Sequence, residues 1–258
     1  MDSHEQRATA AVALTLLDLT NLKDDCTPEA IEKLCARARG AFGNTAAICI
    51  WPRFVSQARE LLGANSGVKI ATVVNFPSGD QPVEEVVAET RQAIADGADE
   101  IDLVIPYKAF RAGDEAAVDR MVRAVKAACT APVILKTILE TGELKEAGLI
   151  RRAAEIAIAA GSDFIKTSTG KVNVNATLEA ADIMMLAIRD SRRRVGFKPA
   201  GGISTVADAA LYLRLASTIM SDDWVMPSTF RFGASGLLDD IESVIAHGKP
   251  LAAAASGY

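Results

Sequence analysis

Three charged residues lie at positions where apolar strands are expected. Lys166 and Lys198 each end a short β-rich segment, and Asp102 lies within another. Lysine is rarely buried without a partner, so these charges require an explanation. Two ammonium groups in a partly desolvated site disfavour each other's charge, and we expect the pKa of one of them to fall. A neutral amine can attack a carbonyl and form a Schiff base, which makes Lys166 a candidate nucleophile.

Asp102 would provide a carboxylate that accepts a proton, or holds a proton-carrying water, during the carbinolamine steps. The alternative is structural: Lys166 pairs with Asp102 across the core, and Asp102 is only a counter-ion. Lys136, within a neighbouring β-rich segment, is interpreted as a charge-balancing neighbour of the site. Cys49 is by default a small apolar strand residue, with contact to substrate as its alternative role.

Glycine-rich segments follow three of the expected strands and suggest a phosphate site. They are Thr169-Gly170-Lys171, Ala200-Gly201-Gly202 and Gly233-Ala234-Ser235-Gly236. A glycine pair alone most often marks an ordinary turn. Three such loops on successive strands, one of them with a lysine, favour a phosphorylated substrate, because barrels often hold phosphate in these loops and at a helix N-terminus.

The elements that would position these residues alternate along the whole chain. Short β-rich segments are separated by Ala-rich, helix-like segments, and the expected strands are Leu14–Leu19, Ala46–Trp51, Lys69–Asn75, Glu100–Ile105, Val133–Leu139, Asp163–Thr167, Gly196–Lys198 and Phe230–Gly233. Eight such units in 258 residues predict a (β/α)8 TIM barrel with an extra N-terminal helix. An open doubly wound sheet is the alternative, but no G-x-G-x-x-G follows the first strands. We expect one barrel over residues 1–250 and a flexible C-terminal tail over residues 251–258.

Composition and charge exclude several classes of protein. With 28 basic and 33 acidic residues and no long basic run, the chain is not expected to bind nucleic acid. The apolar stretch before Asp18 lacks the layout of a signal or spanning helix, so we expect a cytoplasmic protein without membrane contact. The four cysteines form no C-x-x-C pair and are expected to be reduced thiols. Two histidines, His4 and His247, make a histidine metal site or a Ser-His-Asp triad improbable.

Eight segments, in order from about residue 14 to 240, carry a resemblance to a known family. They are Leu17-Asp18-Leu19-Thr20, Gly43-Asn44-Thr45-Ala46-Ala47-Ile48-Cys49-Ile50, Val74-Asn75-Phe76-Pro77, Ala95-Asp96-Gly97-Ala98-Asp99-Glu100-Ile101-Asp102, Leu139-Glu140-Thr141-Gly142-Glu143-Leu144, Asp163-Phe164-Ile165-Lys166-Thr167-Ser168-Thr169-Gly170, Gly196-Phe197-Lys198-Pro199-Ala200-Gly201-Gly202 and Arg231-Phe232-Gly233-Ala234-Ser235. The sequence resembles the 2-deoxyribose-5-phosphate aldolases, and within them the longer bacterial branch whose members end in tyrosine.

The resemblance implies a class I aldolase without metal or cofactor. Such an enzyme reversibly cleaves 2-deoxy-D-ribose 5-phosphate to acetaldehyde and D-glyceraldehyde 3-phosphate in deoxyribose phosphate catabolism. By position, Lys166 matches the Schiff-base lysine, Asp102 the proton-relay aspartate and Lys198 the second lysine. The partners implied are therefore a small phosphosugar and aldehydes, and a homodimer is plausible.

The resemblance also assigns the periphery of the site. Residues expected to bind substrate are Asp18, Thr20, Cys49, Asn75, Phe76, Lys136 and Thr169, and those expected to bind phosphate are Gly170, Lys171, Gly201, Gly202, Ser235 and Gly236. Gly236 stands where close relatives often have a second serine, although a backbone N–H can bind phosphate there. Tyr258 would bring its hydroxyl into the site for the enamine proton step, the alternative being a terminal residue without a role.

Two other functions compete with this interpretation. A different Schiff-base lyase, acting on another phosphosugar or a keto acid, would share Lys166 and the phosphate loops. It would not be expected to share the segments around Asp18, Asn75 and Asp102 so fully. A non-catalytic barrel that binds a sugar phosphate would be expected to lack at least one of Asp102, Lys166 and Lys198, and all three are present.

Overall fold

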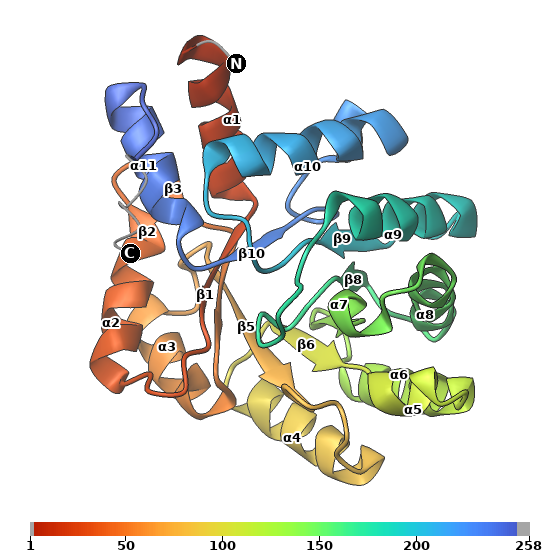
Figure 1. Ribbon diagram of the computed structural model, residues 1–258. Helices are drawn as coiled ribbons and strands as arrows, with labels where there is room; N and C mark the ends of the chain where they lie inside the picture. The colour runs from red at the N-terminus through yellow and green to blue at the C-terminus, as the bar shows by residue number, and fades with distance from the viewer. Residues whose placement is uncertain (1–2, 252–258) are drawn as a thin grey trace, which may run out of the picture.

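A closed ring of parallel strands forms the centre of the protein, as seen in the computed structural model, which describes residues 3–251 (Figure 1). The strands follow one another around the ring in the order β10-β1-β4-β5-β6-β7-β8-β9, all neighbours being parallel. Bridges from Phe197 to Phe230 and from Ala200 to Gly233 join the last strand to the first. The predicted barrel is therefore confirmed, and the open-sheet alternative is excluded.

The strands are short, and their bounds match the predicted segments closely. They are β1 (Leu17–Asn21), β4 (Ala47–Ile50), β5 (Lys69–Val74), β6 (Glu100–Val104), β7 (Ile134–Ile138), β8 (Phe164–Lys166), β9 (Gly196–Lys198) and β10 (Phe232–Ala234). A small antiparallel hairpin, β2 (Arg39–Gly40) with β3 (Gly43–Asn44), was not predicted, since two-residue strands leave no alternation to detect.

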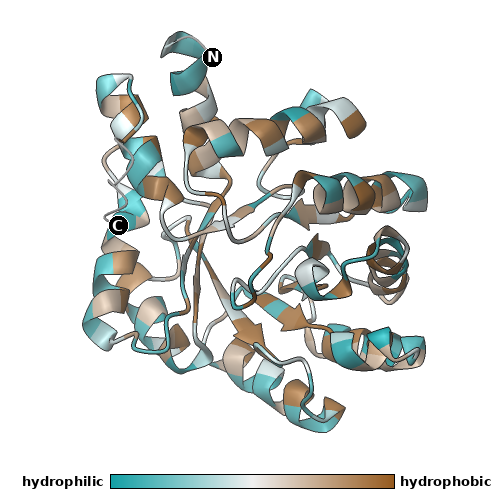
Figure 2. Ribbon diagram, viewed as in Figure 1, coloured by the Kyte–Doolittle hydropathy of each residue, from teal (hydrophilic) through white to brown (hydrophobic). Residues whose placement is uncertain are grey.

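Helices surround the ring, and apolar residues concentrate on the strands and the inner helix faces (Figure 2). They are α1 (Ser3–Thr15), α2 (Pro28–Arg37), α3 (Val55–Leu62), α4 (Val83–Ala95), α5 (Tyr107–Arg111), α6 (Glu115–Ala128), α7 (Thr141–Leu144), α8 (Ala147–Ala159), α9 (Leu178–Ser191), α10 (Val206–Ile219) and α11 (Leu237–His247). The helix α1 confirms the expected N-terminal helix. The prediction that Leu14 and Thr15 begin the first strand was wrong, because Ala10, Ala13 and Leu14 pack at helical spacing.

Side-chain alternation along the strands separates an apolar outer layer from a charged interior. In β6, Ile101 and Leu103 pack outward in the main core beneath the helices, whereas Glu100 and Asp102 point into the barrel. In β8, Ile165 faces the core and Lys166 faces inward. Parallel strands thus bury apolar side chains against the helices and gather charges along the barrel axis.

Three sequence-based expectations about the rest of the chain can be compared with the structure. All four cysteines are free thiols. No helix within residues 3–251 is long and apolar enough to span a membrane. The expected tail begins at Leu251, and its remaining residues, among them Tyr258, lie outside the described part of the chain.

Candidate active site

Lys166, Lys198 and Asp102 meet inside the barrel. Lys166 and Lys198 are register partners at the ends of β8 and β9, and Asp102 reaches them from β6. One carboxylate oxygen, Oδ2 of Asp102, lies 2.8 Å from Nζ of Lys166 and 2.8 Å from Nζ of Lys198. Asp102 and Lys198 are fully buried, and Lys166 is only 3% exposed. The three predicted catalytic residues that the structure describes therefore form one hydrogen-bonded group.

A second layer of charges supports this group from below. Asp18 Oδ2 lies 2.6 Å from Lys198 Nζ, and Asp18 Oδ1 accepts from Arg231 at 2.7 Å. Arg231 also donates to Glu100 at 2.9 Å. Lys136 bonds to Glu100 and, at 3.1 Å, to Asp102 Oδ1. The cluster contains one more cation than carboxylates: Lys136, Lys166, Lys198 and Arg231 against Asp18, Glu100 and Asp102.

Burial and pairing act against each other on the charges of this cluster. Burial alone would raise the pKa of Asp102, but Lys136, Lys166 and Lys198 hold it well below its ordinary value. Burial would lower the pKa of Lys198, but the carboxylates of Asp102 and Asp18 raise it. Asp102 is therefore a carboxylate and Lys198 an ammonium at neutral pH. The expectation that the two lysines simply repel each other omitted the carboxylate that lies between them.

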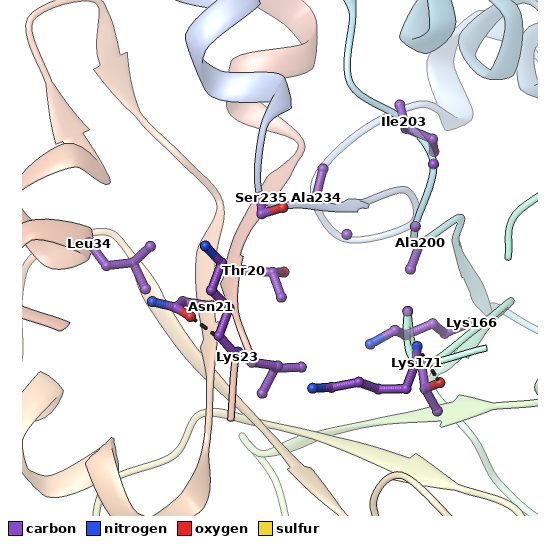
Figure 3. A pocket seen from close by; sticks show the side chains of 16 residues that line it. Thr20, Asn21, Lys23, Leu34, Lys166, Lys171, Ala200, Ile203, Ala234 and Ser235 are labelled. Carbon is purple, nitrogen blue, oxygen red and sulfur yellow. Dashed lines mark hydrogen bonds between the residues drawn. The ribbon is translucent and has the colours of Figure 1, made fainter. Parts of the chain in front are cut away.

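A cavity of about 390 Å³ opens above Lys166 at the carboxyl ends of the strands (Figure 3). Its walls come from the segments that follow β1, β8, β9 and β10, which is where TIM barrels place their working residues. The residues that line it are Thr20, Asn21, Leu22, Lys23, Leu34, Lys166, Thr169, Gly170, Lys171, Ala200, Gly201, Gly202, Ile203, Gly233, Ala234 and Ser235. A carbonyl compound in this cavity can therefore reach the amine of Lys166.

Bare backbone borders part of this cavity. A Cβ added to Gly170 or Gly202 would have no heavy atom within 4 Å, and both glycines adopt a positive φ, of 83° and 80°. Gly236 is equally open and is the N-cap of α11, directly after Ser235. Backbone N–H groups at such glycines and at the start of a helix are suited to an anion. Gly236 itself does not line the cavity, whereas Ser235, the residue before it, does.

Lys171 adds a positive charge to these loops. Its side chain lines the cavity (Figure 3). The ammonium nitrogen, Nζ, lies 2.9 Å from Asp24 Oδ1 and 5.7 Å from the ring centroid of Trp51. The side chain of Asp24 is 86% exposed, so this ion pair is screened and weak. An incoming anion can therefore compete for the ammonium of Lys171.

Five residues predicted to bind substrate do not line the cavity: besides Asp18, which belongs to the ion cluster, they are Cys49, Asn75, Phe76 and Lys136. Cys49 is buried, with Sγ 4.0 Å from Asp102 Oδ2. The amide of Asn75 donates to Val104 O at 2.8 Å and accepts from Gln81 N at 2.9 Å. Phe76 packs edge-on against Trp51, and Lys136 lies within the ion cluster. None of these residues lines the cavity, whereas Thr20 and Thr169 do.

Sequence reasoning gave no role to two members of the ion cluster, Glu100 and Arg231. A signal for Glu100 was present, because it stands two residues before Asp102 and must share its face of the strand. Arg231 precedes β10, and its partners come from β1 and β6. Among residues 3–251, no group of three His, Cys, Asp or Glu side chains is arranged to hold a metal ion.

Comparison with known proteins agrees with this geometry. The model of the DeoC/LacD family aldolases matches residues 12–238. The chain belongs to this family. It is 69% identical over 258 residues to the deoxyribose-phosphate aldolase of Agrobacterium fabrum, covering 100% of this chain and 99% of the relative. The resemblance inferred from the sequence, and with it the aldolase class of lyase, is confirmed.

Solved structures of other family members share the fold. A putative deoxyribose-phosphate aldolase from Toxoplasma gondii superposes with a TM-score of 0.88 at 26% identity, covering 96% of this chain and 97% of that one. A putative deoxyribose-phosphate aldolase from Coccidioides immitis gives a TM-score of 0.79 at 30% identity, covering 91% and 87%. The family's barrel therefore extends over nearly the whole chain.

Proposed function

We propose that this protein cleaves 2-deoxy-D-ribose 5-phosphate reversibly to acetaldehyde and D-glyceraldehyde 3-phosphate, through a Schiff base on Lys166. The observation that carries the proposal is the group of Lys166, Asp102 and Lys198, joined at 2.8 Å at the base of the cavity. The full-length similarity to the Agrobacterium fabrum aldolase supports the substrate. The rival, a Schiff-base lyase for another phosphosugar or a keto acid, would use the same lysine on a different carbonyl.

The pairing within the cluster favours Lys166 as the nucleophile. Lys198 contacts two carboxylates and Lys136 three, whereas Lys166 contacts only Asp102. Removal of one proton from Lys166 leaves three cations facing three carboxylates. The free amine then attacks the C1 carbonyl, and the carbinolamine loses its hydroxyl as water to give the iminium. The carbonyl oxygen takes one proton from the Lys198 ammonium, and Asp102 carries the proton that the nitrogen loses to the same oxygen, so that water leaves and Asp102 is again a carboxylate. Hydrolysis of the product iminium later returns a proton to Lys198.

The iminium then acts as the electron sink for bond cleavage. The C3 hydroxyl loses its proton to Asp102 through a water, the C2–C3 bond breaks, and D-glyceraldehyde 3-phosphate leaves. The electron pair of that bond forms an enamine on Lys166, which is protonated at C2 and hydrolysed to acetaldehyde and the free amine. Because Asp102 is held as a carboxylate beside the protonated Lys198, both a base and an acid lie next to the reacting nitrogen.

The phosphate group is proposed to lie at the opposite end of the cavity from Lys166. Gly170 and Gly202 offer backbone N–H groups, and Ser235 offers a hydroxyl before the first turn of α11. The N–H of Gly201 donates to Gly233 O at 3.2 Å, so Gly201 would contribute to this end of the cavity through its bare backbone. Lys171 supplies the charge, exchanging Asp24 for phosphate. Binding at this end holds C1 of the sugar toward Lys166.

A coupled assay tests this function directly. Purified protein mixed with 2-deoxy-D-ribose 5-phosphate should release acetaldehyde, followed by an NADH-dependent alcohol dehydrogenase. EDTA is expected to leave the rate unchanged, because each carboxylate of the cluster is paired with lysine or arginine. Release of pyruvate from a keto acid, with no cleavage of the deoxy sugar, would favour the rival lyase. Inhibition by EDTA that added metal reverses would contradict a class I mechanism.

Tyr258 is proposed to assist the protonation of the enamine. The chain after α11 returns along the helix, since Leu251 N donates to Asp240 Oδ1, in the first turn of α11, at 2.8 Å. That turn follows Ser235 at the cavity wall. Seven residues follow Leu251 and, if extended, would span about 25 Å. We propose that the terminal hydroxyl enters the cavity from the side of the first turn of α11.

Deletion of residues 252–258 is therefore expected to slow exchange of the acetaldehyde methyl protons with D₂O by about tenfold or more, because a proton donor to the enamine is lost. Proton NMR of acetaldehyde with the enzyme measures this exchange. Formation of the Schiff base, followed by borohydride trapping, should keep its wild-type rate. Tyr258→Phe should reproduce the deletion. An exchange rate equal to that of wild type in both variants would assign no role to the tail.

The predictions about domain organisation, cellular location and oligomeric state follow from the resemblance. We infer a single barrel domain over residues 1–250, a cytoplasmic enzyme and a homodimer. Light scattering of the purified protein distinguishes a dimer from a monomer or tetramer.

A further inference from the structure

One buried carboxylate near the cavity has no part in the mechanism above. Glu140 follows β7, its side chain is fully buried, and its backbone is left-handed, with φ 56° and ψ 59°. That conformation is unfavourable for a residue other than glycine and persists where the surroundings fix it. Among the described residues no lysine or arginine forms an ion pair with Glu140, and burial raises its pKa, partly offset by hydrogen bonds from Thr169.

Within residues 3–251, the carboxylate of Glu140 accepts hydrogen bonds from a single residue, Thr169. Thr169 N donates to Oε1 at 3.2 Å, and the Thr169 hydroxyl donates to Oε2 at 2.5 Å. The same hydroxyl oxygen accepts from Lys171 N at 3.0 Å. A continuous chain of hydrogen bonds thus runs from Glu140 through Thr169 to the backbone of Lys171.

These bonds act on a segment that borders the cavity. Thr169, Gly170 and Lys171 all line it, and they form the loop between β8 and α9. Main-chain bonds near Glu140 hold the start of the same loop, because Leu139 N donates to Lys166 O and Thr141 N to Thr167 O, each at 2.9 Å. The backbone of β8 is therefore fixed by the β7 end itself, whereas the part of the loop beyond Thr167 depends on the Glu140 side chain.

We propose that Glu140 is a positioning residue for the phosphate end of the substrate: through Thr169 it orders the Gly170–Lys171 segment, so that its N–H groups and the Lys171 ammonium meet the anion. The inference rests on the proposed function for the identity of the anion. If Glu140 had a purely structural role, its loss would instead destabilise the fold, or would lower kcat/KM equally for every substrate. The two roles therefore predict different effects of substituting Glu140 on substrates with and without phosphate.

The test compares 2-deoxy-D-ribose 5-phosphate with 2-deoxy-D-ribose, using Glu140→Ala and, as a second variant, Thr169→Val. Thr169→Val keeps the side-chain shape, removes the hydroxyl from the hydrogen-bond chain and leaves Glu140 in place. Each is expected to raise KM for the phosphorylated sugar about tenfold with kcat within about threefold, since ordering a loop is a cost of binding. On 2-deoxy-D-ribose, kcat/KM of Glu140→Ala should stay within about twofold of wild type. Glu140→Gln, which keeps one acceptor oxygen, should fall between wild type and Glu140→Ala.

Controls separate the failure of this inference from that of the proposed function. Glu143→Gln removes a nearby carboxylate that pairs with Arg111 at 3.3 Å and should leave both substrates unaffected. Calorimetry with inorganic phosphate needs no turnover, and wild type should bind it about tenfold more tightly than Glu140→Ala. Equal losses on both sugars, or unchanged phosphate affinity in folded Glu140→Ala and Thr169→Val, would overturn the role of Glu140. Wild type that binds phosphate but does not cleave the deoxy sugar would refute the proposed function alone.

Discussion

Lys166→Met is expected to lower kcat/KM for 2-deoxy-D-ribose 5-phosphate by about 10⁴-fold or more, because the covalent route loses its amine. The side chain is nearly fully buried, and Asp102 is its one carboxylate partner in the ion cluster. Without Lys166, Asp102 still pairs with Lys136 and Lys198, so no carboxylate of the cluster is left uncompensated. The melting temperature should therefore stay close to that of wild type while activity disappears.

The matched control for this variant is Lys171→Met. Lys171 also lines the cavity, but its ammonium pairs with the exposed Asp24 at the phosphate end. It should raise KM for the phosphorylated sugar and leave the borohydride reaction with acetaldehyde intact. Steady-state kinetics measure the activity of both variants, and a thermal melt measures their stability. Substantial turnover by Lys166→Met, or loss of adduct formation in Lys171→Met, would be incompatible with the roles assigned to them.

Asp102→Asn has the second large expected effect, because it removes both a base and a buried counter-ion. Lys166 and Lys198 each lose their shared partner, and Lys166 has no other carboxylate in the cluster. We expect kcat to fall about 10³-fold and the free energy of unfolding to fall by about 3 kcal/mol, since breaking a buried ion pair leaves uncompensated charge. Denaturant unfolding and steady-state kinetics measure the two effects.

Glu100→Gln is the control that separates chemistry from stability. Glu100 lies one inward position deeper on the same strand and bonds to Lys136 and Arg231, not to Lys166. It should destabilise the protein by a similar amount with a much smaller loss of kcat. If Glu100→Gln and Asp102→Asn reduce kcat equally, Asp102 acts only as a counter-ion, which is the structural alternative left open by the sequence.

The same carboxylates make a prediction about acid stability. The lysines and arginine around Asp18 and Asp102 outweigh burial, and the folded-state pKa of each lies below the ordinary value of about 3.9. A lowered folded-state pKa contributes stability that is present at neutral pH and is lost as pH falls below about 4. Asp102→Asn should therefore lose less stability than wild type as the pH falls from about 5 to about 3, around the ordinary carboxyl pKa.

The sequence predicted the barrel and the pair of lysines inside it because both leave local signals. Apolar strands of β8 and β9 end in lysine, and glycine loops follow them, so Lys166 and Lys198 were placed side by side by strand order alone. The first strand was misplaced at Leu14, where helical and extended patterns overlap. Strand ends are set by hydrogen-bond register with neighbours, which one sequence does not reveal.

Features that depend on contacts across the barrel could not be predicted. Arg231 reaches Asp18 and Glu100 only because the ring closes between β9 and β10. The bridging position of Asp102 Oδ2 depends on how far its strand is shifted relative to β8 and β9. The left-handed backbone of Glu140 has no sequence signal, since glutamate rarely adopts it, and its partner Thr169 is 29 residues away.

Reductive trapping tests the central claim most directly. The protein is incubated with acetaldehyde and borohydride, digested, and its peptides are analysed by mass spectrometry. We predict an ethyl group on Lys166, absent from Lys198 and Lys171, with loss of activity in proportion to the modified fraction. Active protein that carries no adduct on Lys166 after trapping, or an adduct on Lys198 alone, would contradict the mechanism.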